Sequence, residues 1–350
     1  RVVFINGRLN RELSQLDELP AEVSLRPLAE ALEDSGLSTW IELQSAQPGG
    51  TARNAFLPLN RAFAEDGLVL TVGRNYRLER PIHLIYLSAP GEAAHIANPQ
   101  LFVWAKTGSE VTFIESYHAL QAGTYFNNTA SWIDLEANAR VSHYKLQREG
   151  QDAFQVNNTL VRQDRDSCYN SYAVDLGGRL VRNNVSVELR DSNTETHLYG
   201  TYLGAGSQHI DNQTFIDHAV PHCESNELYK GILKDKARGV FNGKVLVRQD
   251  AQKTNAFQQN SSLVLSPWAV MDAKPQLEIF ADDVRCSHGA TIGHLDETSV
   301  FYLRSRGIPE DQARNLLQQA FLGEVIENMG LDEVREHVSQ LIAAKLSDEA

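Results

Sequence analysis

The sequence has 350 residues, of which 42% are hydrophobic and 22% charged, and this length predicts a large core with more than one packing unit. Its net charge of -13 argues against nonspecific nucleic-acid binding, which depends on Lys and Arg side chains at phosphates. No run approaches the roughly 18 apolar residues of a membrane span, so we expect neither a nucleic-acid nor a membrane partner.

The cysteines and the asparagines give an expectation about the compartment. Cys168, Cys223 and Cys286 are an odd number and lie far apart, which is a poor disulfide framework and indicates a reducing, cytoplasmic setting. The visible start carries no secretory signal, and because it is Arg1 we expect a fragment that lacks its natural N-terminus. We therefore interpret the Asn-x-Ser/Thr matches as strand-and-turn residues rather than glycosylation sites; they begin at Asn127, Asn157, Asn184, Asn212 and Asn260.

Residues 1–67 have a mixed pattern and form the first predicted region. The apolar run at residues 2–5 is followed by Asn-Gly, which predicts a short hairpin. A helix is expected to begin at Pro27 and to end near Gly36. Residues 54–64 are helical or irregular, because a proline interrupts them.

Residues 68–295 form the second predicted region, in which short β-type runs follow one another without a convincing amphipathic helix. Small and polar residues precede many of these runs, as at the corners of a coil. The clearest runs are residues 68–72, 82–87, 101–104, 111–114, 132–135, 141–146, 185–189, 245–247 and 263–265.

Similar strand starts recur about 30 residues apart, as from Val111 to Val141 and from Val240 to Val270. This loose repeat is typical of a β-solenoid, in which each coil buries its inner face only by stacking on its neighbours. An ordinary β-sandwich also contains short strands joined by turns. We favour the solenoid because a helix-free span of this length exceeds a typical single sandwich.

Residues 296–350 form the third predicted region, with helical periodicity. Asp296 is a suitable N-cap for a first helix, which Gly307 would end. Pro309 would open a second helix, and a third is expected over residues 332–346. We expect these helices to cap one end of the solenoid and to protect its open sheet edge.

The leading candidate site is the pair Cys286 and His288. Residues two apart on a strand point to the same face, and thiolate sulfur with imidazole nitrogen suits iron or zinc. Two ligands do not complete a tetrahedral site, so the others must come from elsewhere in the chain or from a partner. On spacing alone, a structural cysteine beside a hydrogen-bonded histidine explains the pair as well.

A second cluster contains His218, His222 and Cys223, whose spacing resembles that of zinc ligands. Pro221 disturbs a regular strand there, and the acidic residue of a metalloprotease motif is absent, so we favour a turn.

Carboxylates near histidines, such as Asp211 and Asp217 with His209, could support glycosidic cleavage on a β-helix face. No pair of carboxylates stands out, and neither a phosphate-binding Gly-rich loop nor a serine nucleophile elbow is present in the sequence. We therefore predict that the chain is not itself a nucleotidase or a serine hydrolase.

Three segments carry a family resemblance, namely residues 252–256, 274–291 and 301–309. They resemble the SufB/SufD family of iron–sulfur cluster assembly proteins, and Cys-Ser-His-Gly-Ala-Thr from Cys286 is similar to the SufD branch. The resemblance implies a right-handed parallel β-helix with flanking helical regions. It also implies a non-catalytic scaffold subunit of a SufBCD complex.

The resemblance further implies two partners and a cargo. A SufB-like chain would form a heterodimer through the end of the β-helix, and a SufC-like ABC ATPase would bind the C-terminal helices. A nascent iron–sulfur cluster would form transiently at the SufB interface, with His288 as a ligand and Cys286 as its motif neighbour, and none would be tightly bound to the isolated chain. Cys168 and Cys223 match no family position.

Two other classes of function stay open from the residues. One is a β-helix carbohydrate-active enzyme, which cleavage of a polysaccharide would reveal. The other is a homo-oligomeric β-solenoid without chemistry, for which the isolated chain would dimerise and His288→Ala would change no activity.

Overall fold

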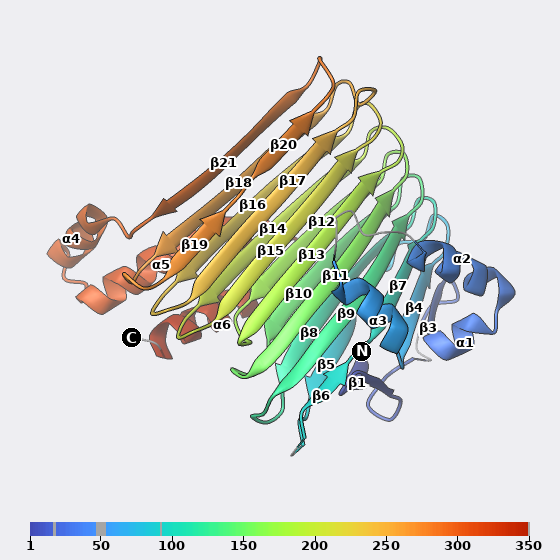
Figure 1. Cartoon of the computed structure of the whole chain (residues 1–350), viewed down its shortest axis with the longest axis horizontal. Helices are drawn as coiled ribbons and strands as arrows, with labels where there is room; N and C mark the ends of the chain where they lie inside the picture. Colours follow the sequence, from blue (N-terminus) through green and yellow to red (C-terminus); the bar gives the residue numbers. More distant parts are fainter. Residues whose placement is uncertain (17–18, 47–53, 92, 349–350) are drawn as a thin grey trace.

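The protein is a parallel β-solenoid of about 8 turns with helices at both ends of the chain. The structure is a computed structural model and describes residues 1–16, 19–46, 54–91 and 93–348. In Figure 1 the colours run in order across the row of strands, so the chain advances by one coil at a time. The predicted β-solenoid is confirmed, and the sandwich alternative is wrong.

Successive strands of the solenoid mostly alternate between two sheets, so each coil contributes to both. Sheet A has ten strands, and each is hydrogen-bonded to the next in the following order. They are β2 (Arg8–Asn10), β1 (Val2–Ile5), β5 (Ile82–Ser88), β8 (Glu110–Ala119), β10 (Arg140–Arg148), β12 (Cys168–Asp175), β14 (Glu195–Gly204), β16 (Glu224–Leu233), β18 (Asn255–Val264) and β21 (Arg285–Gly293).

Sheet B lies opposite sheet A across the interior and has eleven strands. Its main path contains β19 (Val270–Ala273), β17 (Arg238–Val247), β15 (His209–His218), β13 (Leu180–Leu189), β11 (Ala153–Gln163), β9 (Tyr125–Leu135), β7 (Gln100–Ala105), β4 (Gly67–Val72) and β3 (Val23–Pro27). Two short strands, β20 (Gln276–Ile279) and β6 (His95–Ala97), pair with β17 and β9. The strand pairs of the solenoid coils are parallel, as stacking in one direction requires.

Residues of the two sheets that point inward form one continuous core. Val111 lies opposite Val141 and Val141 opposite Tyr169, so one column of side chains passes through successive coils. The repeat between Val111 and Val141 is therefore a true register match. Val270, by contrast, pairs with Arg238 rather than with Val240, because that coil is two residues longer than expected.

The N-terminal predictions are only partly confirmed. The hairpin of β1 and β2 turns at Asn6 and Gly7, both with positive φ. The first helix, α1 (Leu28–Leu32), ends before Gly36, because the Asp34 side chain accepts from two backbone N–H groups and starts a new helix. That helix, α2 (Ser35–Ser45), was not predicted. In α3 (Phe56–Phe63) the proline lies in the first turn, where its missing N–H does no harm.

The three C-terminal helices occur as predicted, but their position corrects one expectation. They are α4 (Glu297–Ser305), α5 (Glu310–Ile326) and α6 (Asp332–Asp348), and Asp296 caps the first of them. Leu322, Val338 and other apolar side chains of α5 and α6 pack on the outer face of sheet A, against Tyr172 and Leu203. The helices α5 and α6 therefore cover a face of the solenoid. They leave the edge strand β21 open, contrary to the expectation that they protect it (Figure 1). No helix in the described ranges is long and apolar enough to cross a bilayer.

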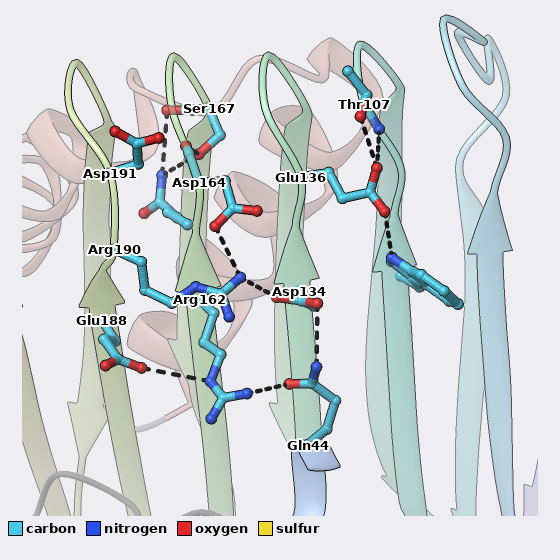
Figure 2. A network of polar contacts seen from close by, with 12 residues as sticks. Gln44, Thr107, Asp134, Glu136, Arg162, Asp164, Ser167, Glu188, Arg190 and Asp191 are labelled. Carbon is cyan, nitrogen blue, oxygen red and sulfur yellow. Dashed lines mark hydrogen bonds and ion pairs between the residues drawn. The ribbon is translucent and has the colours of Figure 1, made fainter. Parts of the chain in front are cut away.

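The N-terminal helices cover the outer face of sheet B at the other end of the chain. Trp40 of α2 stacks on Trp104 with 4.9 Å between ring centroids and donates to Asp134 of β9. Arg190, directly after β13, binds the same Asp134 at 2.8 Å, so a carboxylate joins the helix to the sheet (Figure 2).

The five Asn-x-Ser/Thr asparagines are all buried, which confirms that they are structural residues. Asn157 and Asn212 each share a hydrogen bond with Asn183, so amides bind amides from coil to coil. This ladder satisfies polar groups that would otherwise be costly inside the solenoid.

Candidate functional site

The solenoid ends in an unpaired strand that carries both predicted site residues. In the described part of the chain β21 pairs with β18 on one side and has no strand on the other. Figure 1 shows β21 along the outer edge of the row of strands. An open edge of nine residues offers free backbone N–H and C=O groups to another chain.

Cys286 and His288 end two columns of inward-facing side chains. In register, Cys286 lies opposite the buried Ala256 and His288 opposite the buried Gln258. Both side chains therefore lie on the inner face of sheet A, where no further coil of the described chain covers them. His288 is exposed. The structure thus places the two residues side by side at the end of the solenoid.

The two residues differ in their accessibility. Cys286 is partly buried and packs against a small apolar cluster that contains Val247, Ala256 and Ala281. This burial raises the pKa of the Cys286 thiol, so the thiol is protonated at neutral pH. The exposed imidazole is the more available ligand of the pair.

A polar column lies beneath His288, and no local sequence pattern indicated it. Gln258 donates to the carboxylate of Glu227, which also accepts from Thr214 at 3.2 Å. Burial raises the pKa of Glu227 to about 7, although the two hydrogen bonds oppose the shift. The column could be recognised only after the register had placed Glu227, Gln258 and His288 opposite one another.

The buried Glu227 predicts a pH dependence of stability. The carboxyl has an ordinary pKa of 4.5 in the unfolded chain and about 7 in the folded one. Its contribution to the free energy of unfolding is therefore fully present below pH 4.5 and is lost as the pH rises through 7. We expect Glu227→Gln to be more stable than the wild type by about 3 kcal/mol at pH 8 and by little at pH 5. Thermal unfolding of both proteins across this range checks the prediction. Parallel profiles would contradict it.

The cluster at His218 is structural. His218 is fully buried, its Nε2 lies 2.9 Å from Ser225 Oγ, and burial lowers its pKa to about 4. His222 occupies a turn with φ 63°, and the buried thiol of Cys223 lies 3.5 Å from the Asp191 carbonyl. These three residues do not converge on one point, which agrees with the turn that their sequence favoured.

The carboxylates considered for glycosidic cleavage are engaged in ion pairs. Arg182 binds Asp211 at 2.7 Å, and Arg248 binds both oxygens of Asp217. A glycosidase needs two free carboxyl groups that face each other across a substrate. Neither residue has this freedom, so the arrangement does not favour a carbohydrate-active enzyme.

Apolar side chains surround the open end. Several of the large exposed hydrophobic residues belong to the last strands or to the loops between them. They are Phe257, Trp268, Val270, Ile279, Phe280 and Ile292. Such a collection beside an unpaired edge marks a surface for association.

Comparison with known proteins identifies the family. Residues 87–321 match the model of the SufBD core domain of the SUF system for FeS cluster assembly, and residues 1–84 match that of the SufBD protein N-terminal region. The chain is 36% identical to an iron–sulfur cluster assembly SufBD family protein of Synechocystis, over 99% of the chain and 77% of that protein.

Two further relatives are also similar to this chain. The iron–sulfur cluster assembly protein SufD of Escherichia coli is 32% identical over 99% of the chain and 79% of its own length. Protein ABCI7, chloroplastic, of Arabidopsis thaliana is 35% identical over 82% of the chain and 63% of its own length. The chain therefore belongs to the SufBD family of iron–sulfur cluster assembly proteins and is SufD-like.

Proposed function

We propose that this chain is the SufD-like scaffold subunit of a complex with a SufB-like chain and a SufC-like ATPase, in which His288 binds a nascent iron–sulfur cluster. The observation that carries the proposal is the exposed imidazole on the terminal strand β21. The cluster is a transient cargo, and the ligands that His288 lacks come from the partner chain. The chain performs no catalysis of its own.

The open end of the solenoid supports a partner chain at this position. A long unpaired edge is a hazard for aggregation unless another strand or chain covers it. The exposed apolar residues around β21 would be buried by the same contact. A SufB-like chain that pairs with this end would bring its own ligands next to His288.

Cys286 has a secondary role in this proposal. It lies two residues from His288 on the same face of β21, so both side chains can reach one cluster. Its raised pKa means that a metal must displace the thiol proton before sulfur can bind. His288 is therefore the first ligand, and Cys286 is available for a later step.

The experiment replaces His288 by alanine in the purified complex with the SufB-like and SufC-like subunits. Iron and sulfide per complex are measured after anaerobic reconstitution. We expect cluster content to fall at least about tenfold, because even residues that only support a ligand change metal affinity by that much. The fold should be unchanged, since the exposed imidazole fills no core volume.

Ser287→Ala is the matched control, because Ser287 lies on the same strand but on its opposite face. This variant should keep the wild-type content of iron and sulfide. Full cluster content in His288→Ala would contradict the site and would favour a solenoid without metal chemistry, whether the chain dimerises with itself or not.

We place the ATPase subunit at the exposed surface of the C-terminal helices. Phe301 and Tyr302 of α4 are 71% and 57% exposed, an unusual state for neighbouring aromatic residues. Deleting the whole helical region is a poor test, because α5 and α6 cover apolar residues of sheet A. Point substitutions on α4 leave that packing intact.

We expect the double variant Phe301→Glu and Tyr302→Glu to weaken binding of the ATPase subunit by about tenfold or more, as for aromatic anchors of an interface. Titration calorimetry with the full chain measures the affinity. Leu120→Glu, at an equally exposed position between β8 and β9, is the control and should bind normally. Equal affinities for all three proteins would refute this docking surface.

A further inference from the structure

A group of metal-ligand side chains lies on the outer face of sheet A, away from the open end. It consists of Cys168 of β12 with Glu195 and His197 of β14. One ligand atom of each residue lies within 4.8 Å of the other two. Among the residues that the structure describes, no other group of three or more Cys, His, Asp or Glu side chains converges in this way.

The register of the solenoid brings these residues together. Cys168 lies directly opposite Glu195, and His197 follows two residues later on the same face of β14. The face is the outer one, because the next residue along, Tyr169, belongs to the interior core. Sulfur, nitrogen and oxygen ligands thus come from only two neighbouring strands.

The surroundings of Cys168 are polar, although only 5% of the residue is exposed. Asn170 Nδ2 lies 3.5 Å from its sulfur, and Arg140 is opposite it on β10. A cysteine that serves only as a small apolar residue would have apolar neighbours. Burial and the carboxylate of Glu195 raise the pKa of Cys168, so a metal would have to displace the thiol proton.

The imidazole of His197 is already held in position. Its ring stacks on Tyr199 with 6.2 Å between centroids and 7° between planes, and Tyr199 in turn stacks on Tyr172. His197 Nε2 lies 4.0 Å from a Glu195 carboxylate oxygen. His197 Nδ1 lies 3.4 Å from Asn226 Nδ2. If the Asn226 amide is flipped, so that its oxygen faces the ring, His197 Nδ1–H donates to that oxygen and leaves Nε2 free to bind a metal.

We propose that Cys168, Glu195 and His197 bind one divalent transition-metal ion of the zinc and ferrous-iron class. Thiolate and imidazole select such ions against magnesium and calcium, which require oxygen ligands. Bonds of about 2.0–2.3 Å would place tetrahedral ligand atoms about 3.3–3.8 Å apart. The group must contract by about 1 Å to reach this geometry. The exposed side chain of Glu195 can supply this movement by changing its rotamer.

Three protein ligands leave one coordination position for water or an exchangeable ligand. The next carboxylate, Glu224, lies opposite Glu195 on β16 and accepts from Asn255. An ion with an open position can be exchanged, in contrast to a closed structural zinc site.

The metal site is separate from the open end of the solenoid. In sheet A, β16 and β18 lie between β14, which carries Glu195, and the edge strand β21. At about 4.8 Å between neighbouring strands, β14 and β21 are roughly 14 Å apart. The site also lies on the outer face, whereas His288 is on the inner one. The inference therefore does not depend on the proposed function of His288.

The test uses the full chain with Cys286→Ser and His288→Ala as background, so that the open end cannot contribute. Titration with Co²⁺ follows the thiolate-to-cobalt charge-transfer absorption. We expect one equivalent to bind and the band to vanish when Cys168→Ser is added. Glu195→Gln and His197→Gln should each weaken binding at least about tenfold. Because Glu195 is exposed, its variant keeps the test valid if Cys168→Ser folds poorly.

Cys223→Ser is the control and should retain the band, because Cys223 lies outside the group. Zinc should displace cobalt, whereas excess magnesium should not, and an anaerobic Fe²⁺ competition distinguishes a ferrous from a zinc site. Absence of the band in the background protein would overturn the proposal. So would a band that persists in a folded Cys168→Ser variant, or displacement by magnesium.

Discussion

Gly231→Ala is expected to destabilise the protein by about 3 kcal/mol or more. Gly231 of β16 lies opposite Tyr202 of β14, and a Cβ atom there would overlap the Tyr202 ring. The ring has no room to move away, because Tyr202 is 1% exposed and its hydroxyl lies 3.1 Å from Ser262 Oγ. The added methyl group therefore forces a shift of the ring or of the coil.

The arrangement is reciprocal, which makes the pair a distinctive packing unit. Gly200 of β14 lies opposite Tyr229 of β16, and its missing Cβ leaves room for that second ring. Chemical denaturation measures the loss of stability. Gly289→Ala on β21 is the control, because a Cβ there meets no atom within 4 Å and should be tolerated. Wild-type stability in Gly231→Ala would show that the two coils adjust freely, contrary to this packing.

Lys145→Met is expected to cost about 3–5 kcal/mol, the usual effect of leaving one buried charge without its partner. Lys145 Nζ lies 3.0 Å from Asp175 Oδ1 inside the solenoid, where only 2% of the Asp175 side chain is exposed. The same carboxylate also accepts from Asn183 at 2.7 Å. Without the ammonium group, the carboxylate keeps one hydrogen bond but loses its counter-charge.

The double variant Lys145→Met and Asp175→Asn should recover most of that loss, because Asp175 is then no longer a charge without its partner. Denaturant unfolding of the wild type, both single variants and the double variant gives the coupling energy between the two side chains. If the losses of the single variants simply added, the buried pair would not be an electrostatic unit, and this account of the interior would be wrong.

Much of the fold could be predicted from local sequence patterns. Short apolar runs separated by small residues indicated stacked coils, and Asp296, Gly307 and Pro309 indicated the start and end of C-terminal helices. These signals depend only on a few neighbouring residues. The helix α2 was missed because its N-cap, Asp34, lies within the segment assigned to the preceding helix.

The long-range arrangement could not be predicted in the same way. The packing of α5 and α6 on the face of sheet A depends on outward-facing residues such as Tyr172 and Leu203, which lie in different coils. The group of Cys168 and His197 depends on a register that spans 27 residues from Cys168 to Glu195. Coils differ in length, as the two-residue error at Val270 shows, so spacing alone does not fix which residues meet.

The candidate site was predicted in part. The two-residue spacing of Cys286 and His288 correctly placed them on one face of a strand. Spacing did not indicate that this strand would be the open edge. The expectation that a SufB-like partner supplies the remaining ligands came only from the family resemblance. The buried column of Gln258 and Glu227 had no local signature, because its members lie about one coil apart.

The most direct test asks whether a nitrogen of this chain binds the cluster. The chain is labelled with ¹⁵N-histidine, assembled with unlabelled SufB-like and SufC-like subunits, and reconstituted with iron and sulfide. Pulsed electron paramagnetic resonance of the reduced cluster should then reveal a strong ¹⁵N coupling that disappears in His288→Ala. A paramagnetic cluster in the wild-type complex without any ¹⁵N coupling would contradict the central claim.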